Sequence, residues 1–199
     1  MDSENEKTLV EILEPNIQVD LAKYIKFVSN PQSGAIATFS GTTRDTFEGK
    51  IVVELRYEAY VPMAERQIKS ICSSARLSWS LEAMAVAHRL GSVPVGETSV
   101  FVAISSVHRD DALDACKYVI DELKASVPIF KKEVYANGEV WKENSEFLER
   151  RDQYSSHVSS TGGRVCCGSK VHKVPVAKEK KICCGNKTKV RDEEAECAS

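Results

Sequence analysis

Apolar residues near the start of the chain recur at spacings that indicate two strands with a helix between them. Residues 8–13 (TLVEIL) form a short apolar run that favours a strand. Leu21, Ile25 and Val28 then recur at intervals of three or four residues, the spacing of one helix face. Residues 34–41 (GAIATFSG) are apolar and bounded by glycines, which predicts a buried strand.

Residues 51–75 show regular spacing of apolar residues that predicts a strand followed by a helix. Ile51, Val53, Leu55 and Tyr57 occupy alternate positions, and charged residues separate the later ones, which is typical of a half-buried strand. A helix is expected from Pro62, with the proline in its first turn. The apolar positions that lie on one face of this helix are Ala64, Ile68, Ile71 and Ala75.

Two further strands and a longer helix are expected between residues 82 and 126. In residues 82–91, the larger side chains Met84, Val86, His88 and Leu90 occupy alternate positions, and residues 98–107 are apolar enough for a central strand. Asp110 and Asp111 suit the cap and the dipole at a helix N-terminus. The helix should end near Ser126, because Pro128 disfavours helical geometry at the residue before it. Its expected apolar positions are Leu113, Cys116, Ile120 and Leu123.

A hairpin and a change in composition complete the pattern. Asn137 and Gly138 lie between strand-forming segments and suit a type I′ hairpin turn. Strands and helices without regular βαβ repetition favour an α+β domain over residues 1–150. Residues 151–199 are rich in Ser, Gly, Lys, Glu and Cys with little periodicity, so they are expected to form a disordered tail.

Composition and charge narrow the class of function. With 199 residues, 42% of them hydrophobic, the chain can bury one core of ordinary size. A formal charge of −2 gives no overall attraction for nucleic acid. There is no apolar run long enough for a membrane span and no secretory-signal pattern, so we expect a cytoplasmic protein that binds neither nucleic acid nor membrane. The seven cysteines are expected to be free thiols.

Lys124 has two interpretations. With Asp114, Lys117 and Asp121 it forms a ladder of alternating charge at helical spacing, which is typical of a solvated face. A cation near a helix C-terminus also complements the helix dipole. Against this, the last helical turn before a proline is a place where a side chain can point into a cleft. Spacing alone favours the solvated face.

The lysines after Pro128 lie in an expected extended segment. Side chains alternate there, so Lys131 and Glu133 would face one way and Phe130 and Lys132 the other. One of the two lysines can therefore point into a site while its neighbour is solvated. The pattern alone does not choose between them.

Three other basic positions follow buried strands. His108 and Arg109 lie at a strand-to-helix junction, where backbone N–H groups and a guanidinium can share a phosphate. A plain surface loop explains this junction equally well. Arg44 follows residues 34–41, and a lone arginine there is usually a surface charge. His88 lies in an alternating apolar segment and is interpreted as a structural histidine.

Metal binding has weak support. The tail contains enough donors for zinc or copper(I), namely Cys166, Cys167, His172, Cys183 and Cys184. Adjacent cysteine pairs differ from the CxxC spacing of structural zinc sites, and no apolar residues surround them. We therefore expect neither a metal nor another cofactor.

Four segments in order resemble the large, catalytic subunit of molybdopterin synthase: ATFSGTTRD, LRYEAYVPMAERQI, AHRLGSVPVGETSVFVAISSVHRDDAL, and ELKASVPIFKKE followed by GEVW. The resemblance covers about residues 9–146, and the tail lies outside it. It implies an α/β hammerhead-type domain with an additional small antiparallel β-sheet.

The resemblance also implies an activity in molybdenum cofactor biosynthesis. A sulfurtransferase of this family takes sulfur from the C-terminal Gly-Gly thiocarboxylate of a small ubiquitin-like carrier subunit. It transfers the sulfur to cyclic pyranopterin monophosphate and so forms the dithiolene of molybdopterin. The assembly implied is a heterotetramer, in which a homodimer of catalytic subunits binds two carriers.

Site residues follow from the same resemblance. It implies that Lys124 and Lys131 are catalytic, with Lys131 facing the pocket and Lys132 facing solvent. The residues assigned to substrate binding are Arg44, His108, Arg109, Lys124, Lys131, Lys132 and Glu133. Two other classes compete with this function: a non-catalytic scaffold whose cysteine tail binds metal or partners, and an unrelated phosphate-ester enzyme. The presence of both Lys124 and Lys131 argues against the scaffold.

Overall fold

The structure is a computed structural model that describes residues 7–136 and 138–142. The described residues form, in order, β1 (Lys7–Leu13), α1 (Leu21–Val28), β2 (Ala35–Thr42), β3 (Thr46–Phe47), β4 (Lys50–Ala59), α2 (Val61–Ser78), β5 (Ala83–Arg89), β6 (Gly91–Pro94), β7 (Thr98–Ser106), α3 (Arg109–Ser126), β8 (Ile129–Tyr135) and β9 (Gly138–Lys142). None of these helices is long and apolar enough to cross a membrane. The predicted tail lies outside the described residues.

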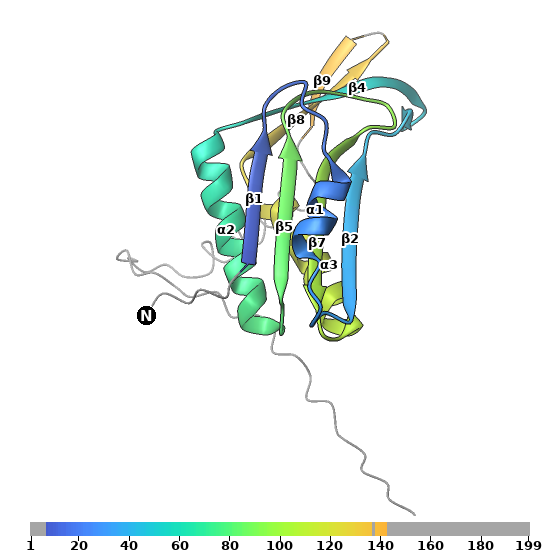
Figure 1. The fold of residues 1–199 in the computed structure, drawn as a ribbon. Coiled ribbons are helices and arrows are strands. Elements are labelled where there is room, and N and C mark those ends of the chain that lie inside the picture. The colour runs from blue at the N-terminus through green and yellow to red at the C-terminus, as the bar shows by residue number, and fades with distance from the viewer. Residues whose placement is uncertain (1–6, 137, 143–199) are drawn as a thin grey trace, which may run out of the picture.

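The strands form two sheets, which confirms the α+β class. The larger sheet has the order β1-β5-β7-β2, in which only the β1–β5 pair is parallel. The smaller sheet has the order β3-β4-β8-β9, with β6 also paired to β4. Figure 1 shows β4, β8 and β9 gathered at one end of the larger sheet. The long antiparallel pair of β4 and β8 therefore brings distant parts of the chain to that end.

Helices cover both faces of the larger sheet, and the side chains of β5 show why. Every residue of β5 is buried, and alternate residues face opposite helix layers. Met84 and Val86 pack in the main core with α2 and α3. The three alanines of β5 face α1 instead, where Tyr24 and Val28 pack against them. Small side chains on that face let the short helix α1 lie close to the sheet.

The burial of apolar residues in α1 and in β2 differs from the prediction. In α1 the buried residues are Tyr24 and Val28, whereas Leu21 and Ile25 are exposed. The helix therefore turns a face that includes its tyrosine toward the sheet, and Tyr24 donates a hydrogen bond to Glu11 on β1. The predicted buried strand at residues 34–41 is β2, an edge strand in which only Ala37 is buried.

An irregularity in β4 reverses the predicted alternation at its start. The β4–β8 register shifts between Val52 and Glu54, as a β-bulge does. As a result Val52 is buried, while Ile51 and Val53 are exposed. Leu55 and Tyr57, beyond the shift, are part-buried as expected. A sequence pattern cannot show an added residue of this kind, because alternation simply continues through it.

The long helices and the hairpin are confirmed in position, with local corrections. In α2 the four predicted apolar positions are buried. In α3 Leu113 is exposed, and the N-cap is His108 rather than an aspartate. The predicted hairpin joins β8 to β9, but Tyr135 pairs with Gly138, so Gly138 is a strand residue rather than a turn residue.

Candidate active site

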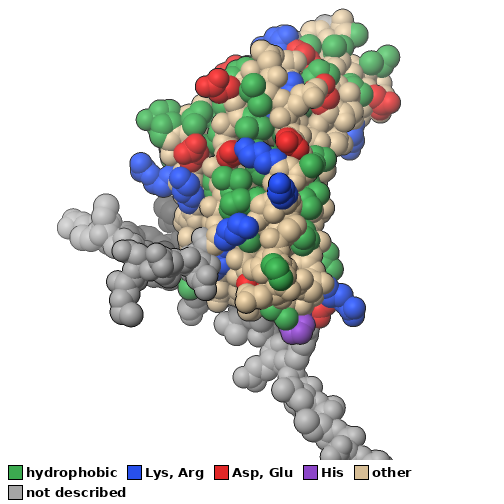
Figure 2. Space-filling model, viewed as in Figure 1, with side chains coloured by type: hydrophobic (Ala, Val, Ile, Leu, Met, Phe, Trp, Pro, Cys, Tyr) green, Lys and Arg blue, Asp and Glu red, His purple; other side chains and the backbone are tan. Residues whose placement is uncertain are grey.

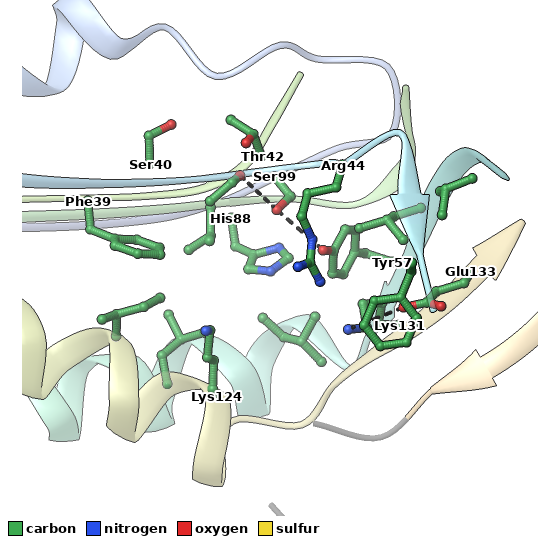
Figure 3. Close-up of a pocket in the computed structure, with 18 of the residues that line it drawn as sticks. Phe39, Ser40, Thr42, Arg44, Tyr57, His88, Ser99, Lys124, Lys131 and Glu133 are labelled. Carbon is green, nitrogen blue, oxygen red and sulfur yellow. Dashed lines mark hydrogen bonds and ion pairs between the residues drawn. The ribbon is translucent and has the colours of Figure 1, made fainter. Parts of the chain in front are cut away.

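A cavity of about 680 Å³ lies where the larger sheet meets the smaller one. Its walls come from β2 and the segment after it, β3, β4, one end each of β5 and β7, the C-terminal end of α3, and β8. Figure 3 shows α3 below the cavity and the strands of the larger sheet above it, with His88 and Arg44 reaching into the space between them. Segments far apart in sequence thus share one concave site, the usual form of a small-molecule site.

The end of α3 brings Lys124 to this cavity. Val127 caps the helix with a backbone hydrogen bond to Leu123, and the chain then turns into β8 through Pro128. Lys124 is half-buried in the last turn, with its Nζ 5.9 Å from the centre of the Phe39 ring on β2. Of the predicted charge ladder, Lys117 and Asp121 do form an exposed ion pair. Lys124 instead faces the cavity (Figure 3).

Strand β8 directs Lys131 and Glu133 to the same side. Both side chains line the cavity, and Lys131 Nζ lies 3.8 Å from Glu133 Oε1. Tyr135 also donates a hydrogen bond to the buried Glu133 carboxylate, and this bond raises the pKa of Tyr135 to about 12. Lys132 does not line the cavity, and its Nζ lies 5.3 Å from the centre of the Trp141 ring. The expected inward orientation of Lys131 is confirmed.

Arg44 adds a third cation from a different segment. It follows β2 in the connection to β3, where its guanidinium carbon lies 5.3 Å from the centre of the Phe47 ring. In Figure 3 the guanidinium points into the cavity, near His88 and above Lys124. Arg44, Lys124 and Lys131 therefore converge from three elements on one space. This arrangement suits an anionic ligand, because all three side chains offer only charged donors.

His108 and Arg109 are not brought to this cavity. Both are exposed at the N-terminal end of α3, where Arg109 Nε lies 3.8 Å from Asp110. Lys124 lies fifteen positions further along the same helix, which corresponds to about 22 Å along its axis. One small ligand cannot contact both ends of α3 within a single chain. The predicted substrate-binding role of His108 and Arg109 stays a prediction.

Sequence reasoning missed His88, Tyr57 and Ser99, which also line the cavity. The Tyr57 hydroxyl donates to Ser99 Oγ at 3.3 Å, and Ser99 donates to the Gly41 carbonyl at 3.1 Å. The tyrosine ring meets the His88 ring edge-on, with centres 4.9 Å apart. The alternating apolar pattern of β5 did place His88 on the helix-covered face. It could not show that α3 ends before reaching that position.

The two cysteines in the described residues lie in the core. Cys72 and Cys116 are free thiols, and burial raises the pKa of each to about 11, which makes them poor nucleophiles. Among residues 7–136 and 138–142, no group of three or more His, Cys, Asp or Glu side chains is arranged to hold a metal ion. The candidate donors of the tail lie outside these residues.

Basic and acidic side chains are interspersed over the face of the molecule shown in Figure 2. That face carries no continuous basic stripe of the kind that attracts nucleic acid. The convergence of cations is thus local to the cavity rather than a property of the surface in view.

Comparisons with known proteins all identify relatives from one family. A family described as "MoaE protein" matches residues 16–126. A molybdopterin synthase catalytic subunit of Arabidopsis thaliana is 62% identical over 195 residues, covering 94% of this chain and 98% of that protein. Because so little of the chain remains unmatched, this similarity must include most of the residues after 150.

Solved structures agree with the fold. Molybdopterin synthase from Staphylococcus aureus is similar with a TM-score of 0.61 and 31% identity, covering 70% of this chain and 97% of that one. A complex of subunits 1 and 2 of molybdopterin-converting factor from Helicobacter pylori is similar in fold, with a TM-score of 0.57 and 20% identity over 68% of this chain and 91% of that one.

Proposed function

The chain belongs to the MoaE family of molybdopterin synthase catalytic subunits, and we propose on that premise that its cation-lined cavity is the site of sulfur transfer. The family reaction moves sulfur from the thiocarboxylate of a small carrier subunit to cyclic pyranopterin monophosphate. Two such transfers form the dithiolene of molybdopterin in molybdenum cofactor biosynthesis. The chain is the sulfurtransferase subunit of this enzyme.

One observation carries the assignment of the site: Arg44, Lys124 and Lys131 line a single cavity. The substrate is a phosphate ester and the sulfur donor is a thiocarboxylate, so both reactants are anions that repel each other. Fixed cations in a partly enclosed space offset that repulsion without having to reorganise during the reaction. A scaffold that performs no chemistry would not need three cations converging in this way.

Each cation has a proposed role. Arg44 binds the phosphate or the pterin, since its planar guanidinium can hold two oxygens at once. Lys124 lies at the end of a helix, and we assign it to the carrier's thiocarboxylate, where its charge stabilises negative charge that develops on the carbonyl oxygen. Lys131 assists binding or proton transfer, and Glu133 holds Lys131 in place. Lys132 contributes charge near the site without lining it.

A second copy of the chain would complete the site. The family relationship implies that His108 and Arg109 bind substrate, yet they lie about 22 Å from Lys124 along α3. Substrate binding by His108 and Arg109 is compatible with this distance if the N-terminal end of α3 in each subunit of a homodimer lies at the cavity of the other subunit. Each cavity then contains His108 and Arg109 of the other copy. With one carrier subunit on each catalytic subunit, the assembly is a heterotetramer.

We also propose a cytoplasmic location and a division of the chain at about residue 150. The described cysteines are free thiols, as a reducing compartment favours. Residues 1–150 form the catalytic domain, and residues 151–199 act outside the reaction itself.

The test of the site uses the purified chain, a thiocarboxylated carrier and cyclic pyranopterin monophosphate. Lys124→Ala should lower dithiolene formation by on the order of a hundredfold or more, with the circular dichroism spectrum unchanged. Lys124→Arg, which keeps the charge, should retain part of the activity, whereas Lys117→Ala on the solvated face should retain all of it. Normal activity of folded Lys124→Ala would refute the assignment.

A further inference from the structure

His88 is the one uncharged base whose ring reaches into the cavity in Figure 3. It is the penultimate residue of β5 and shares a face with Met84 and Val86, which α2 and α3 cover. Because α3 ends at Ser126, the same face opens onto the cavity at His88. The side chain is only 4% exposed, yet it forms part of the cavity wall.

The hydrogen bond of the ring fixes which nitrogen carries the proton. Nδ1 of His88 lies 2.9 Å from the backbone carbonyl oxygen of Arg89. A carbonyl oxygen can only accept, so Nδ1 must donate, and in the neutral ring Nε2 then carries the lone pair. Within the described residues, no hydrogen bond reaches Nε2. The acceptor atom of the ring is therefore available to a ligand in the cavity.

Neighbouring residues hold the ring in one orientation. The Tyr57 ring packs edge-on against it at an interplanar angle of 75°, and Tyr57 is itself fixed by its bond to Ser99. The hydrogen bond from Nδ1 to the Arg89 carbonyl further restrains the imidazole. An acceptor that is preorganised in this way loses little entropy when a ligand binds.

The charges around the cavity determine what His88 can do. Arg44, Lys124 and Lys131 can only donate, and the Glu133 carboxylate already accepts from Tyr135 and faces Lys131. Burial lowers the pKa of His88 to about 4, so the ring is neutral at physiological pH and is a weak proton acceptor. It suits the role of a fixed hydrogen-bond acceptor rather than that of a general base.

We propose that His88 is a specificity-determining residue whose Nε2 accepts a hydrogen bond from an N–H or O–H group of the heterocyclic substrate. This inference rests on the proposed function. Cations attract any anion, including free phosphate, so they do not distinguish a pterin from other phosphate esters. A neutral acceptor at a fixed position selects a ring that presents a donor there, and it leaves a ligand without that donor weakly bound.

The first experiment compares substitutions in the reconstituted enzyme. His88→Asn keeps a donor that can reach the Arg89 carbonyl but removes the acceptor at the Nε2 position, whereas His88→Gln can restore an acceptor there. We expect His88→Asn to raise KM for cyclic pyranopterin monophosphate about tenfold with little change in kcat. His88→Gln should recover part of the loss, and the control Lys117→Ala, on the exposed face of α3, should leave KM unchanged.

The second experiment needs no substitution in the protein that is measured. In the chain labelled with ¹⁵N-histidine, the Nε2 resonance of His88 should shift on addition of the substrate, while that of Nδ1 stays in place. His88→Asn serves to assign the signal. An Nε2 resonance that does not move at saturating substrate, or an unchanged KM in folded His88→Asn, overturns the proposal.

Failure of this inference can be distinguished from failure of the proposed function. If the wild-type chain forms dithiolene but neither readout depends on His88, only the role of His88 is wrong. If the wild-type chain with its carrier forms no dithiolene, the proposed function is wrong as well.

Discussion

Lys131 Nζ lies 3.8 Å from the Oε1 atom of Glu133, two residues along the same strand and on the same side of it. Glu133 is buried and also accepts a hydrogen bond from Tyr135. One carboxylate thus links a proposed catalytic lysine to a phenol behind the cavity wall. The lysine is held at the cavity by a group that does not itself need to touch the substrate.

The Glu133 carboxylate gives the first prediction. In Glu133→Gln the carboxylate that accepts the hydrogen bond of Tyr135 is gone, so the pKa of Tyr135 should fall from about 12 toward its ordinary value. An ultraviolet pH titration measures this change, and Tyr135→Phe identifies the phenol concerned. Dithiolene formation should fall at the same time, because Lys131 loses its anchor. An unaltered tyrosine titration would contradict the proposed link.

Arg109 should affect the substrate and not the carrier. Arg109 is exposed, at the opposite end of α3 from Lys124, so Arg109→Ala should leave folding unchanged. We expect weaker binding of cyclic pyranopterin monophosphate by calorimetry with carrier affinity intact. Loss of the carrier complex in this variant would instead move Arg109 to the protein–protein interface.

His88 should make stability depend on pH. Its pKa is about 4 in the folded chain, below the value of 6.5 for an unperturbed histidine, so the unfolded chain binds the additional proton between these values. The contribution of His88 to the free energy of unfolding should therefore be constant above about pH 6.5. The free energy of unfolding should fall by about 3 kcal/mol as the pH falls to 4.

Denaturant unfolding at several pH values measures this loss. The difference between wild type and His88→Gln isolates the histidine, because Glu11, whose pKa is lowered mainly by its hydrogen bond with Lys23, titrates equally in both. Parallel stability curves for the two proteins would show that His88 does not titrate as described.

Residues 151–199 should not be needed for catalysis. A variant that ends at Arg150 keeps every residue that lines the cavity, so it should form dithiolene at the wild-type rate. Elemental analysis of this variant and of the full chain, each after exposure to zinc, tests the cysteine tail. Equal, negligible zinc in both is expected, and a stoichiometric excess in the full chain would assign a metal site to the tail.

Much of the fold could be predicted because periodicity reports local structure. The ends of α3 followed from the two aspartates and Pro128, and the core face of α2 followed from spacing. The bulge in β4 and the buried face of α1 could not be predicted, since both depend on which partner strand or sheet face the element meets.

The candidate site was predictable only through resemblance. The spacing of charges favoured a solvated Lys124, because a sequence pattern cannot show where a helix ends relative to a sheet. Alternation along the strand also did not decide whether Lys131 or Lys132 faces the site. His88 was not predicted as a cavity residue for the same reason, because the sequence of its segment is that of a strand fully covered by helices.

Helix α3 carries the side chains proposed to act in the reaction at its two opposite ends, with His108 and Arg109 at one and Lys124 at the other. If each cavity contains His108 and Arg109 of the other copy, a complete active site is built from two polypeptides, so a mutation in one chain affects the cavity of the other. A cell that expresses Lys124→Ala and Arg109→Ala chains together would assemble mixed dimers in which one of the two cavities is fully wild type. Two defective alleles would then complement each other, and a genetic test could reveal a shared site.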